Sequence, residues 1–199
     1  TITNLLDLEG NQLDTSFRVT FFQAPKPSKG DIIISEIMAD PTPPAGLPEV
    51  EYIEIWNVRN TPFDLSNLVV TDGSSSAEII NEEIGANQHI IVCKTGDGSA
   101  LNIYGKVLEL SDFPTLNNSG DQLQLLLNGN ILDEVSYTNT WYDDPTKGNG
   151  GYALELIDTG NTCPTHYNWK ASQAAIGGTP AMPNSSFGTV LDSLAPKVA

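Results

Sequence analysis

The sequence predicts an all-β protein, either a sandwich or a barrel, and three observations lead to this class. Helical periodicity is almost absent along the 199 residues. Short runs of alternating or wholly apolar residues recur instead, separated by clusters of Gly, Pro, Asn, Asp and Ser. The runs follow one another at short spacing, so the chain lacks the strand–helix alternation that is typical of a parallel sheet.

Strands are predicted at residues 18–23, 32–38, 52–57, 67–71, 89–94, 122–127, 131–137 and 152–157. The clearest hairpin is QLQLLLNGNILDEVSY, because Asn128 and Gly129 lie between two apolar runs and readily adopt the positive φ angles of a tight turn. One short helix is predicted at 99–104, with Gly98 or Ser99 as its cap.

The two ends of the chain differ in composition from its middle, which predicts a main domain at 28–187. Residues 1–27 form a strand segment and a Pro/Lys/Ser-containing linker, and residues 188–199 form a second linker. We expect 1–27 to pack on the sandwich as an extra strand, because its alternating apolar residues would otherwise lie on an unpaired edge. The chain begins without an initiator Met, so we interpret it as a piece of a longer polypeptide.

The charge balance narrows the classes of partner. Twenty-five acidic residues against nine basic residues give a net charge of -16. Nucleic acids and anionic lipids are both recognised through Lys and Arg, so neither is an expected partner. No stretch approaches the ~20 apolar residues of a membrane helix, so no membrane insertion is expected.

Two cysteines are present, Cys93 and Cys163, and they form no CxxC pair that would suggest a zinc site. A disulfide between them in an exported protein and two independent buried thiols are the two alternatives. We expect no cofactor.

Seven motifs along about 160 residues resemble successive parts of the lamin tail domain as it occurs in exported bacterial proteins. They are DIIISEIMADP, VEYIEIWN, FDLSNLVVTDG, IGANQHIIVCK, LNNSGDQLQLLLNGNILDEVSY, GGYALELID, and the pair NWKAS and GGTPAMPNS. One departure is Ala181, where Gly usually follows Gly-Thr-Pro. DLEGNQLDTSFRVTF and LDSLAPKVA are similar to the end and the beginning of bacterial immunoglobulin-like domains.

The resemblance implies an immunoglobulin-like β-sandwich without catalytic activity, in an extracellular or cell-surface multidomain protein. Such a module acts as a spacer or as a binding (adhesion) domain for a protein or a glycan, beside neighbouring domains of the same chain. The alternative is an accessory domain that positions an exported nuclease or phosphatase outside this chain.

Glu36 and Glu54 lie near the middle of two isoleucine-rich strands, and their environment has two interpretations. Strict alternation turns both carboxylates towards solvent, while the isoleucines of the opposite face enter the sandwich (Ile33, Ile37, Ile53 and Ile55). Alternatively, the two strands pair and the carboxylates meet, which requires a compensating group. We expect Arg59 or Lys94 in that role, with a calcium ion bound by Glu36, Glu54, Asp40 and Asp72 as the other alternative.

Catalytic patterns are missing from the sequence. No Gly-x-Ser-x-Gly motif is present, and neither His89, expected at a sheet edge, nor His166 has a supporting nucleophile context. A small sandwich without long loops between strands and helices offers no evident cleft for paired carboxylates. The sequence therefore predicts no enzyme.

The loop WYDDPTKGNGGY carries the best candidates for ligand binding, namely Trp141, Tyr142, Asp143 and Asp144. Aromatic rings beside carboxylates can stack on sugars or anchor a protein partner. In the alternative interpretation, Trp141 closes the end of the sandwich and the remaining residues are solvated. Trp169 is expected in the core.

Overall fold

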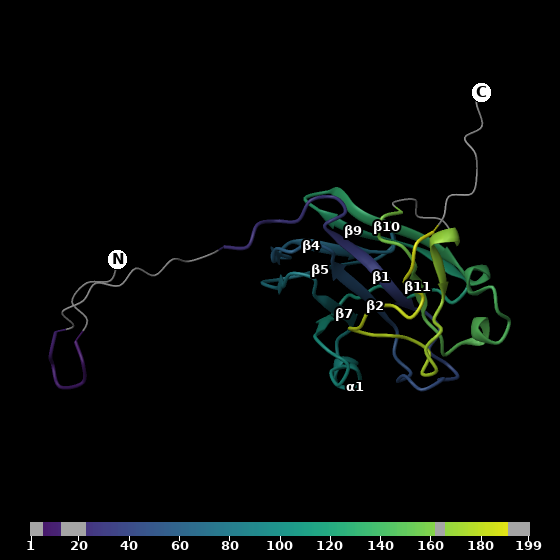
Figure 1. Ribbon diagram of the computed structural model, residues 1–199, viewed down its shortest axis with the longest axis horizontal. Coiled ribbons are helices and arrows are strands. Elements are labelled where there is room, and N and C mark those ends of the chain that lie inside the picture. The colour runs from purple at the N-terminus through teal and green to yellow at the C-terminus, as the bar shows by residue number, and fades with distance from the viewer. Residues whose placement is uncertain (1–5, 13–22, 162–165, 191–199) are drawn as a thin grey trace, which may run out of the picture.

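Two β-sheets packed face to face form the centre of the computed structural model, which describes residues 6–12, 23–161 and 166–190 (Figure 1). The six-stranded sheet has the order β12-β11-β1-β2-β7-β8, and the four-stranded sheet has the order β10-β9-β4-β5. Strands β3 and β6 pair in a separate small sheet. All neighbouring strands are antiparallel except β7 and β8. The predicted all-β class is confirmed, and the architecture is the sandwich.

The strands are β1 (Ile32–Met38), β2 (Tyr52–Asn57), β3 (Phe63–Asp64), β4 (Leu68–Thr71), β5 (Ser76–Glu78), β6 (Glu83–Ile84), β7 (His89–Lys94), β8 (Val107–Leu110), β9 (Gly120–Leu127), β10 (Asn130–Thr138), β11 (Leu154–Leu156) and β12 (Trp169–Ala171). Strands β1, β2 and β7 have the predicted bounds. The strand predicted at 18–23 falls almost wholly outside the described residues. The sequence reading missed β3, β5, β6, β8 and β12, which have two to four residues each and show little alternation.

The helices are short and lie in connections. They are α1 (Gly98–Leu101), η1 (Asn139–Tyr142), η2 (Lys147–Asn149) and η3 (His166–Asn168). The prediction of a helix at 99–104 is wrong in its bounds, because α1 ends at Leu101 and the chain continues as turns. Its N-cap is Asp97, which makes no side-chain cap hydrogen bond.

The β9–β10 hairpin turns as predicted. Asn128 and Gly129 have φ angles of 51° and 77°, so both central residues are left-handed, as the two-residue turn requires. The two strands then pair from Asn130 and Leu127 to Thr138 and Gly120.

The larger sheet is buried on both of its faces. Its inner face and the smaller sheet enclose one apolar cluster that includes Ile34, Ile55 and Leu125. A second cluster lies on the outer face, around Tyr52 and Ile91, under α1 and the C-terminal part of the chain. Because both faces are covered, the central strands carry apolar residues on both of their faces, and Glu36 and Glu54 are buried exceptions.

Strict alternation fails in β1. The register of its pairing with β2 shifts between Ile34 and Glu36, which is the mark of a β-bulge. Ile34 and Ile37 therefore both belong to the inner cluster. Strict alternation predicts Ile33 in that cluster as well, but Ile33 is only partly buried. The bulge turns Glu36 to the outer face.

The described parts of the N-terminal region differ in their contacts. Residues 6–12 form a turn closed by a Leu6–Gln12 bridge, with Gly10 at a φ of 87°. Pro25 already belongs to the sandwich, because its carbonyl oxygen accepts the Asp64 N–H at 2.9 Å. Phe17, Val19 and Phe21, on which the expected packing of 1–27 depends, lie outside the described residues.

Cys93 lies in the outer cluster as a free, buried thiol, and Cys163 lies outside the described residues. Burial, assisted by the charges of Glu109 and Asp97, raises the pKa of the Cys93 thiol to about 12. The thiolate, which is the reactive form, is therefore scarce at neutral pH.

Cys93 is expected to resist alkylation as long as the protein is folded. In a Cys163→Ser variant, N-ethylmaleimide should leave the native protein unmodified at neutral pH, as read by intact mass. The same sample unfolded in guanidinium serves as the control and should take up one equivalent. Equal rates in the two samples would contradict the buried position.

Candidate functional site

Three glutamates meet on the outer face of the larger sheet. Glu36 of β1 is the register partner of Glu54 on β2 and of Glu155 on β11. None of the three side chains has exposed surface. The interpretation that turns Glu36 and Glu54 to solvent is therefore wrong, and the interpretation that pairs them is confirmed. The third member, Glu155, was missed.

A segment near the C-terminal end, residues 178–186, crosses this face and is called the strap here. Its backbone and hydroxyl groups donate to all three carboxylates. Thr179 N–H lies 3.0 Å from Glu36 Oε2, Ala181 N–H donates to Glu54 Oε2, and Ser186 N–H lies 2.8 Å from Glu155 Oε2. Hydrogen bonds to the charged form are what allow a carboxylate to be buried.

Hydroxyl groups complete the network. Tyr52 donates to Glu36, Ser35 donates to Glu54 Oε1 at 2.7 Å, and Ser185 donates to Glu155 Oε2 at 2.8 Å. Thr179 Oγ1 lies 2.8 Å from Glu36 Oε2 and 3.0 Å from Glu155 Oε1. One hydroxyl carries only one proton, so one of these two carboxyls must be protonated for both contacts to be hydrogen bonds.

Glu36 is the group that holds the extra proton. Burial, reinforced by the negative charge of Glu54, raises the pKa of Glu36 to about 8, against the opposing hydrogen bond from Tyr52. The carboxyl of Glu36 is thus mostly neutral at neutral pH, which relieves the repulsion among the three side chains.

The compensating cations predicted from the sequence are wrong. Arg59 is held by Asp31, with 2.7 Å between Nε and Oδ1, and Lys94 is exposed at the end of β7. Gly178 shows how closely the strap lies on the sheet, since a Cβ there would come within 2.6 Å of Glu36 Oε1. The strap supplies neutral donors where the sequence suggested a charge.

His89 adds an imidazole to the edge of this network. Its Nδ1 lies 2.7 Å from Glu54 Oε1, and its ring stacks on Trp56 with centroids 4.7 Å apart. Strand β7 lies between β2 and β8, but β8 pairs with it only from Ile91 on, so His89 has a strand partner only in β2, at Trp56. Phe187, which follows the strap, packs edge-on against Trp56, with ring centroids 6.1 Å apart.

The four carboxylates considered for calcium do not form one site. Glu36 and Glu54 lie under the strap, whereas Asp72 accepts hydrogen bonds from Ser74 and Ser75 in its own turn. Asp40 lies in the loop after β1. Within residues 6–12, 23–161 and 166–190, no group of three or more His, Cys, Asp or Glu side chains is arranged to hold a metal ion.

The loop with Trp141 does not present an aromatic platform. Tyr142 is buried in the inner cluster, and Trp141 is half-buried with its ring 6.5 Å from that of Trp169, which lies in the core as expected. Asp143 is exposed at a φ of 47°, and Asp144 accepts the N–H groups of its own loop. Trp141 packs against the core, as in the alternative interpretation, but the expected solvation of the remaining residues is wrong for Tyr142, which is buried.

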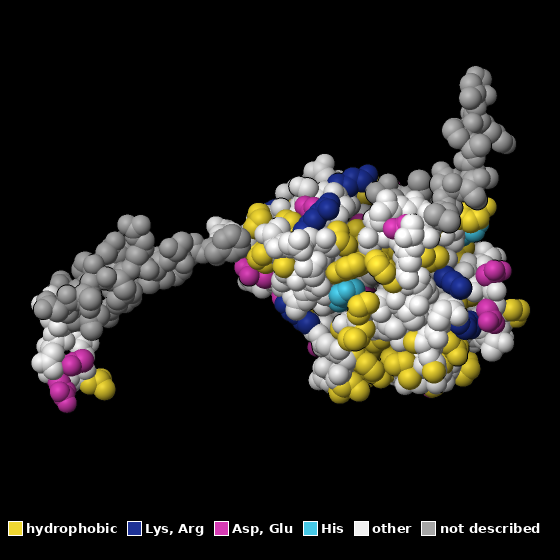
Figure 2. Space-filling model, viewed as in Figure 1, with side chains coloured by type: hydrophobic (Ala, Val, Ile, Leu, Met, Phe, Trp, Pro, Cys, Tyr) yellow, Lys and Arg dark blue, Asp and Glu magenta, His cyan; other side chains and the backbone are white. Residues whose placement is uncertain are grey.

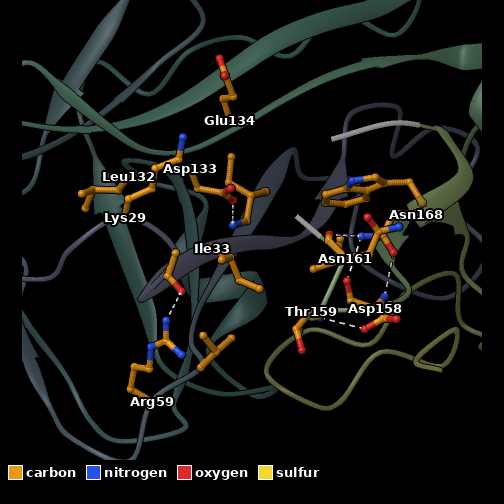
Figure 3. A pocket seen from close by; sticks show the side chains of 16 residues that line it. Lys29, Ile33, Arg59, Leu132, Asp133, Glu134, Asp158, Thr159, Asn161 and Asn168 are labelled. Atoms are coloured by element: carbon orange, nitrogen blue, oxygen red, sulfur yellow. Dashed lines mark hydrogen bonds between the residues drawn. The ribbon is translucent and has the colours of Figure 1, made fainter. Parts of the chain in front are cut away.

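A cleft of about 490 Å³ opens between the first half of β1 and residues 158–161 (Figure 3). Strand β1 pairs with β11 only at Glu36 and Ile37, so the first half of β1 diverges from its neighbour. The gap becomes the cleft, with β1 and β10 on one side and β11, β12 and residues 158–161 on the other. The sequence reading, which expected no cleft, missed it.

Asp133 stands at the point where the two sheets approach each other. A register shift in β10 between Ile131 and Asp133 marks a second bulge, and Asp133 Oδ2 accepts the Ile34 N–H of β1 at 2.7 Å. The carboxylate thus replaces the missing strand neighbour of β1. Burial raises the pKa of Asp133 to about 6, although the Ile34 N–H favours the charged form.

The opposite side of the cleft is fixed by its own hydrogen bonds. Asn168 accepts the Asp158 N–H at 2.9 Å and donates to the carbonyl oxygens of Asp158 and Asn161, at 2.8 Å each. Asp158 Oδ1 and Oδ2 accept the N–H groups of Gly160 and Val190. The loop is therefore held in a defined shape beside the cleft.

Comparison with known protein families gives one match. The family model for the lamin tail domain matches residues 25–139, which is more than half of the chain. The chain belongs to the lamin tail domain family. No curated protein matches it.

The lamin tail domain is a non-catalytic, immunoglobulin-like β-sandwich, in agreement with the two sheets of this structure. The family match covers β1 to β10 and ends at residue 139. Strands β11 and β12 and the strap lie beyond the match, and yet they supply Glu155 and the donors to all three carboxylates. Among the described residues, no helix is long and apolar enough to cross a bilayer.

Proposed function

We propose that this lamin tail domain is a non-catalytic binding module of an exported or cell-surface bacterial protein. It connects neighbouring domains of the same chain and contacts a partner through its surface. The observation that carries the proposal is the closure of the outer face, where Glu36, Glu54 and Glu155 accept hydrogen bonds from the strap. The three carboxylates have no exposed surface, so a substrate cannot reach them.

The surface supports binding more than catalysis. Figure 2 shows hydrophobic side chains gathered over the lower part of the face in view, next to α1, and the exposed apolar residues include Ile103 and Met182. The cleft at Asp133 falls within the ~300–1,000 Å³ range of ordinary ligand sites. The net charge of -16 favours an aqueous surface that meets cationic rather than anionic partners.

The test is made on the intact protein in its own cells. Peptides of this domain should be recovered from the envelope or secreted fraction, and removal of residues 28–187 should reduce attachment to the partner surface. An enzyme elsewhere in the same polypeptide should keep its turnover on a small soluble substrate. Recovery from the cytoplasmic fraction, or unchanged attachment after the deletion, would overturn the proposal.

The alternative of an accessory domain makes a different prediction in the same experiment. If a neighbouring nuclease or phosphatase depends on this module, the deletion should change the range of macromolecular substrates that the enzyme cleaves. Attachment and substrate range are therefore measured side by side.

A further inference from the structure

We propose that the cleft at Asp133 binds the cationic side chain, lysine or arginine, of an extended segment in a partner protein. The Asp133 carboxylate is the counter-charge, and the apolar residues of the cleft contact the aliphatic stem. The inference rests on the binding function proposed above and names its ligand.

The carboxylate of Asp133 is already oriented for such a ligand. Its Oδ2 is fixed by the Ile34 N–H, and two lone pairs on each oxygen leave further acceptor sites. The charged form is unfavourable as long as the cleft is empty, since burial raises the pKa of Asp133 to about 6. A cation that enters the cleft restores the interaction that burial removed.

Other charged groups around Asp133 do not already fill this role. Arg59 is bound to Asp31 at 2.7 Å and to the Gly30 carbonyl oxygen at 3.3 Å. Lys29 lines the cleft and its charge lowers the pKa of Asp133, but among the described residues no ion pair or hydrogen bond joins the two side chains. The charge of Glu134 raises the pKa of Asp133, against the effect of Lys29. The Glu134 side chain points away from the cleft in Figure 3 and accepts a hydrogen bond from Gln124.

The cleft also fits the shape of a long basic side chain. Ile33, Leu132, Leu156 and Trp169 line it with apolar surface, next to the Asp133 carboxylate. Lys and Arg bury their methylene stems on such surfaces while the charged end finds a polar partner. The carboxylate of Asp158 lies on the opposite side of the cleft, where its two oxygens accept the N–H groups of Gly160 and Val190.

Charge distinguishes this ligand from a sugar. Hydroxyl groups could donate to Asp133, but they would leave its negative charge uncompensated in a partly buried position. A cation supplies both the hydrogen bonds and the charge, and the net charge of -16 steers it towards the protein.

The test uses labelled pentapeptides Gly-Gly-X-Gly-Gly, with X as Arg, Lys, Gln or Glu, and fluorescence polarisation. The Arg and Lys peptides should bind, and the Gln and Glu peptides should not. Binding of neutral mono- and disaccharides in competition, without any preference for the basic peptides, would overturn the proposal in favour of a glycan. Absence of binding by all four peptides would also overturn it.

Two variants separate the cleft from general attraction to an acidic protein. Asp133→Asn keeps an oxygen for the Ile34 N–H and should lower the affinity about tenfold. Asp112→Asn removes the same charge from an exposed position outside the cleft and should leave the affinity unchanged. Equal effects of the two substitutions would show that the attraction is not localised.

Lys29→Gln is expected to increase the affinity, whereas misfolding could only decrease it. It removes the cation that competes for Asp133, so the affinity for the Arg peptide should rise. In the unmodified protein, the affinity should fall as the pH drops through about 6, where Asp133 takes up its proton. Intact attachment of the whole protein together with no peptide binding would reject this ligand and leave the proposed function standing.

Discussion

The free energy of unfolding is expected to fall by a few kcal/mol as the pH rises from about 4.5 to about 8, and Glu36 is the main cause. Its pKa is near 4.5 in the unfolded chain and is raised to about 8 in the fold by burial and by Glu54. Between these values the unfolded state releases a proton that the folded state retains, so each pH unit costs stability. The contribution is complete below 4.5 and lost above 8.

Glu36→Gln should flatten this profile. A glutamine accepts the Thr179 N–H through its amide oxygen and carries no charge at any pH, so the loss through Glu36 disappears. Denaturant unfolding at a series of pH values measures it. Glu49→Gln, at an exposed position, is the matched control and should keep the original slope. A Glu36→Gln profile that still follows the unmodified protein would refute the assignment.

Coupling between the carboxylates gives a second readout of the same network. Glu54→Gln alone should also lower the pKa of Glu36, because it removes the charge that assists burial in raising it. The stability change of the double variant should therefore differ from the sum of the two single changes. Additivity within error would mean that the two side chains act independently despite being register partners.

Gly177→Ala is expected to destabilise the protein by about 3 kcal/mol or more. Gly177 has a φ of 96°, and a Cβ on it would lie 1.9 Å from the Gly151 carbonyl oxygen. The left-handed backbone alone costs a residue with a side chain about 1–2 kcal/mol. The clash adds to this, because the Gly177 carbonyl oxygen is itself fixed at 2.7 Å from the Ala153 N–H.

Gly129→Ala separates the two contributions. Gly129 has a φ of 77°, but a Cβ there would have no atom within 4 Å. Its substitution should cost only the backbone part, about 1–2 kcal/mol. Urea unfolding of both variants gives the difference, and equal losses would mean that the chain around Gly151 moves aside without resistance.

Local patterns predicted the parts of the fold that depend on local physics. The bounds of β1, β2 and β7 follow from apolar runs, and the β9–β10 turn follows from the conformational preference of Asn128 and Gly129. Alternation failed where the covalent chain gives no warning of a bulge, at Glu36 and at Asp133. Short strands such as β12 have too few residues to show any period.

The polar network was out of reach for a different reason. The donor for Glu36 is Thr179, which is 143 residues away, and nothing near Glu36 indicates that its partner is a backbone N–H. The sequence alone therefore suggests the charged residues Arg59 and Lys94 as the compensating groups. The cleft also depends on residues far apart in the sequence, since its walls come from β1, β10 and the region of residues 156–169. Tyr142 was expected in a loop surface and is instead part of the core.

The strap imposes an order on biosynthesis. Strands β1 and β2 leave the ribosome early, but Glu36 and Glu54 cannot lose their water until residues 179–181 arrive to donate to them. A nascent or truncated chain that stops before the strap therefore keeps unpaired carboxylates on one face of its central sheet, which opposes closure. We therefore expect a chain that ends before residue 178 to be less stable than the full domain, because its outer face lacks the donors that the strap supplies.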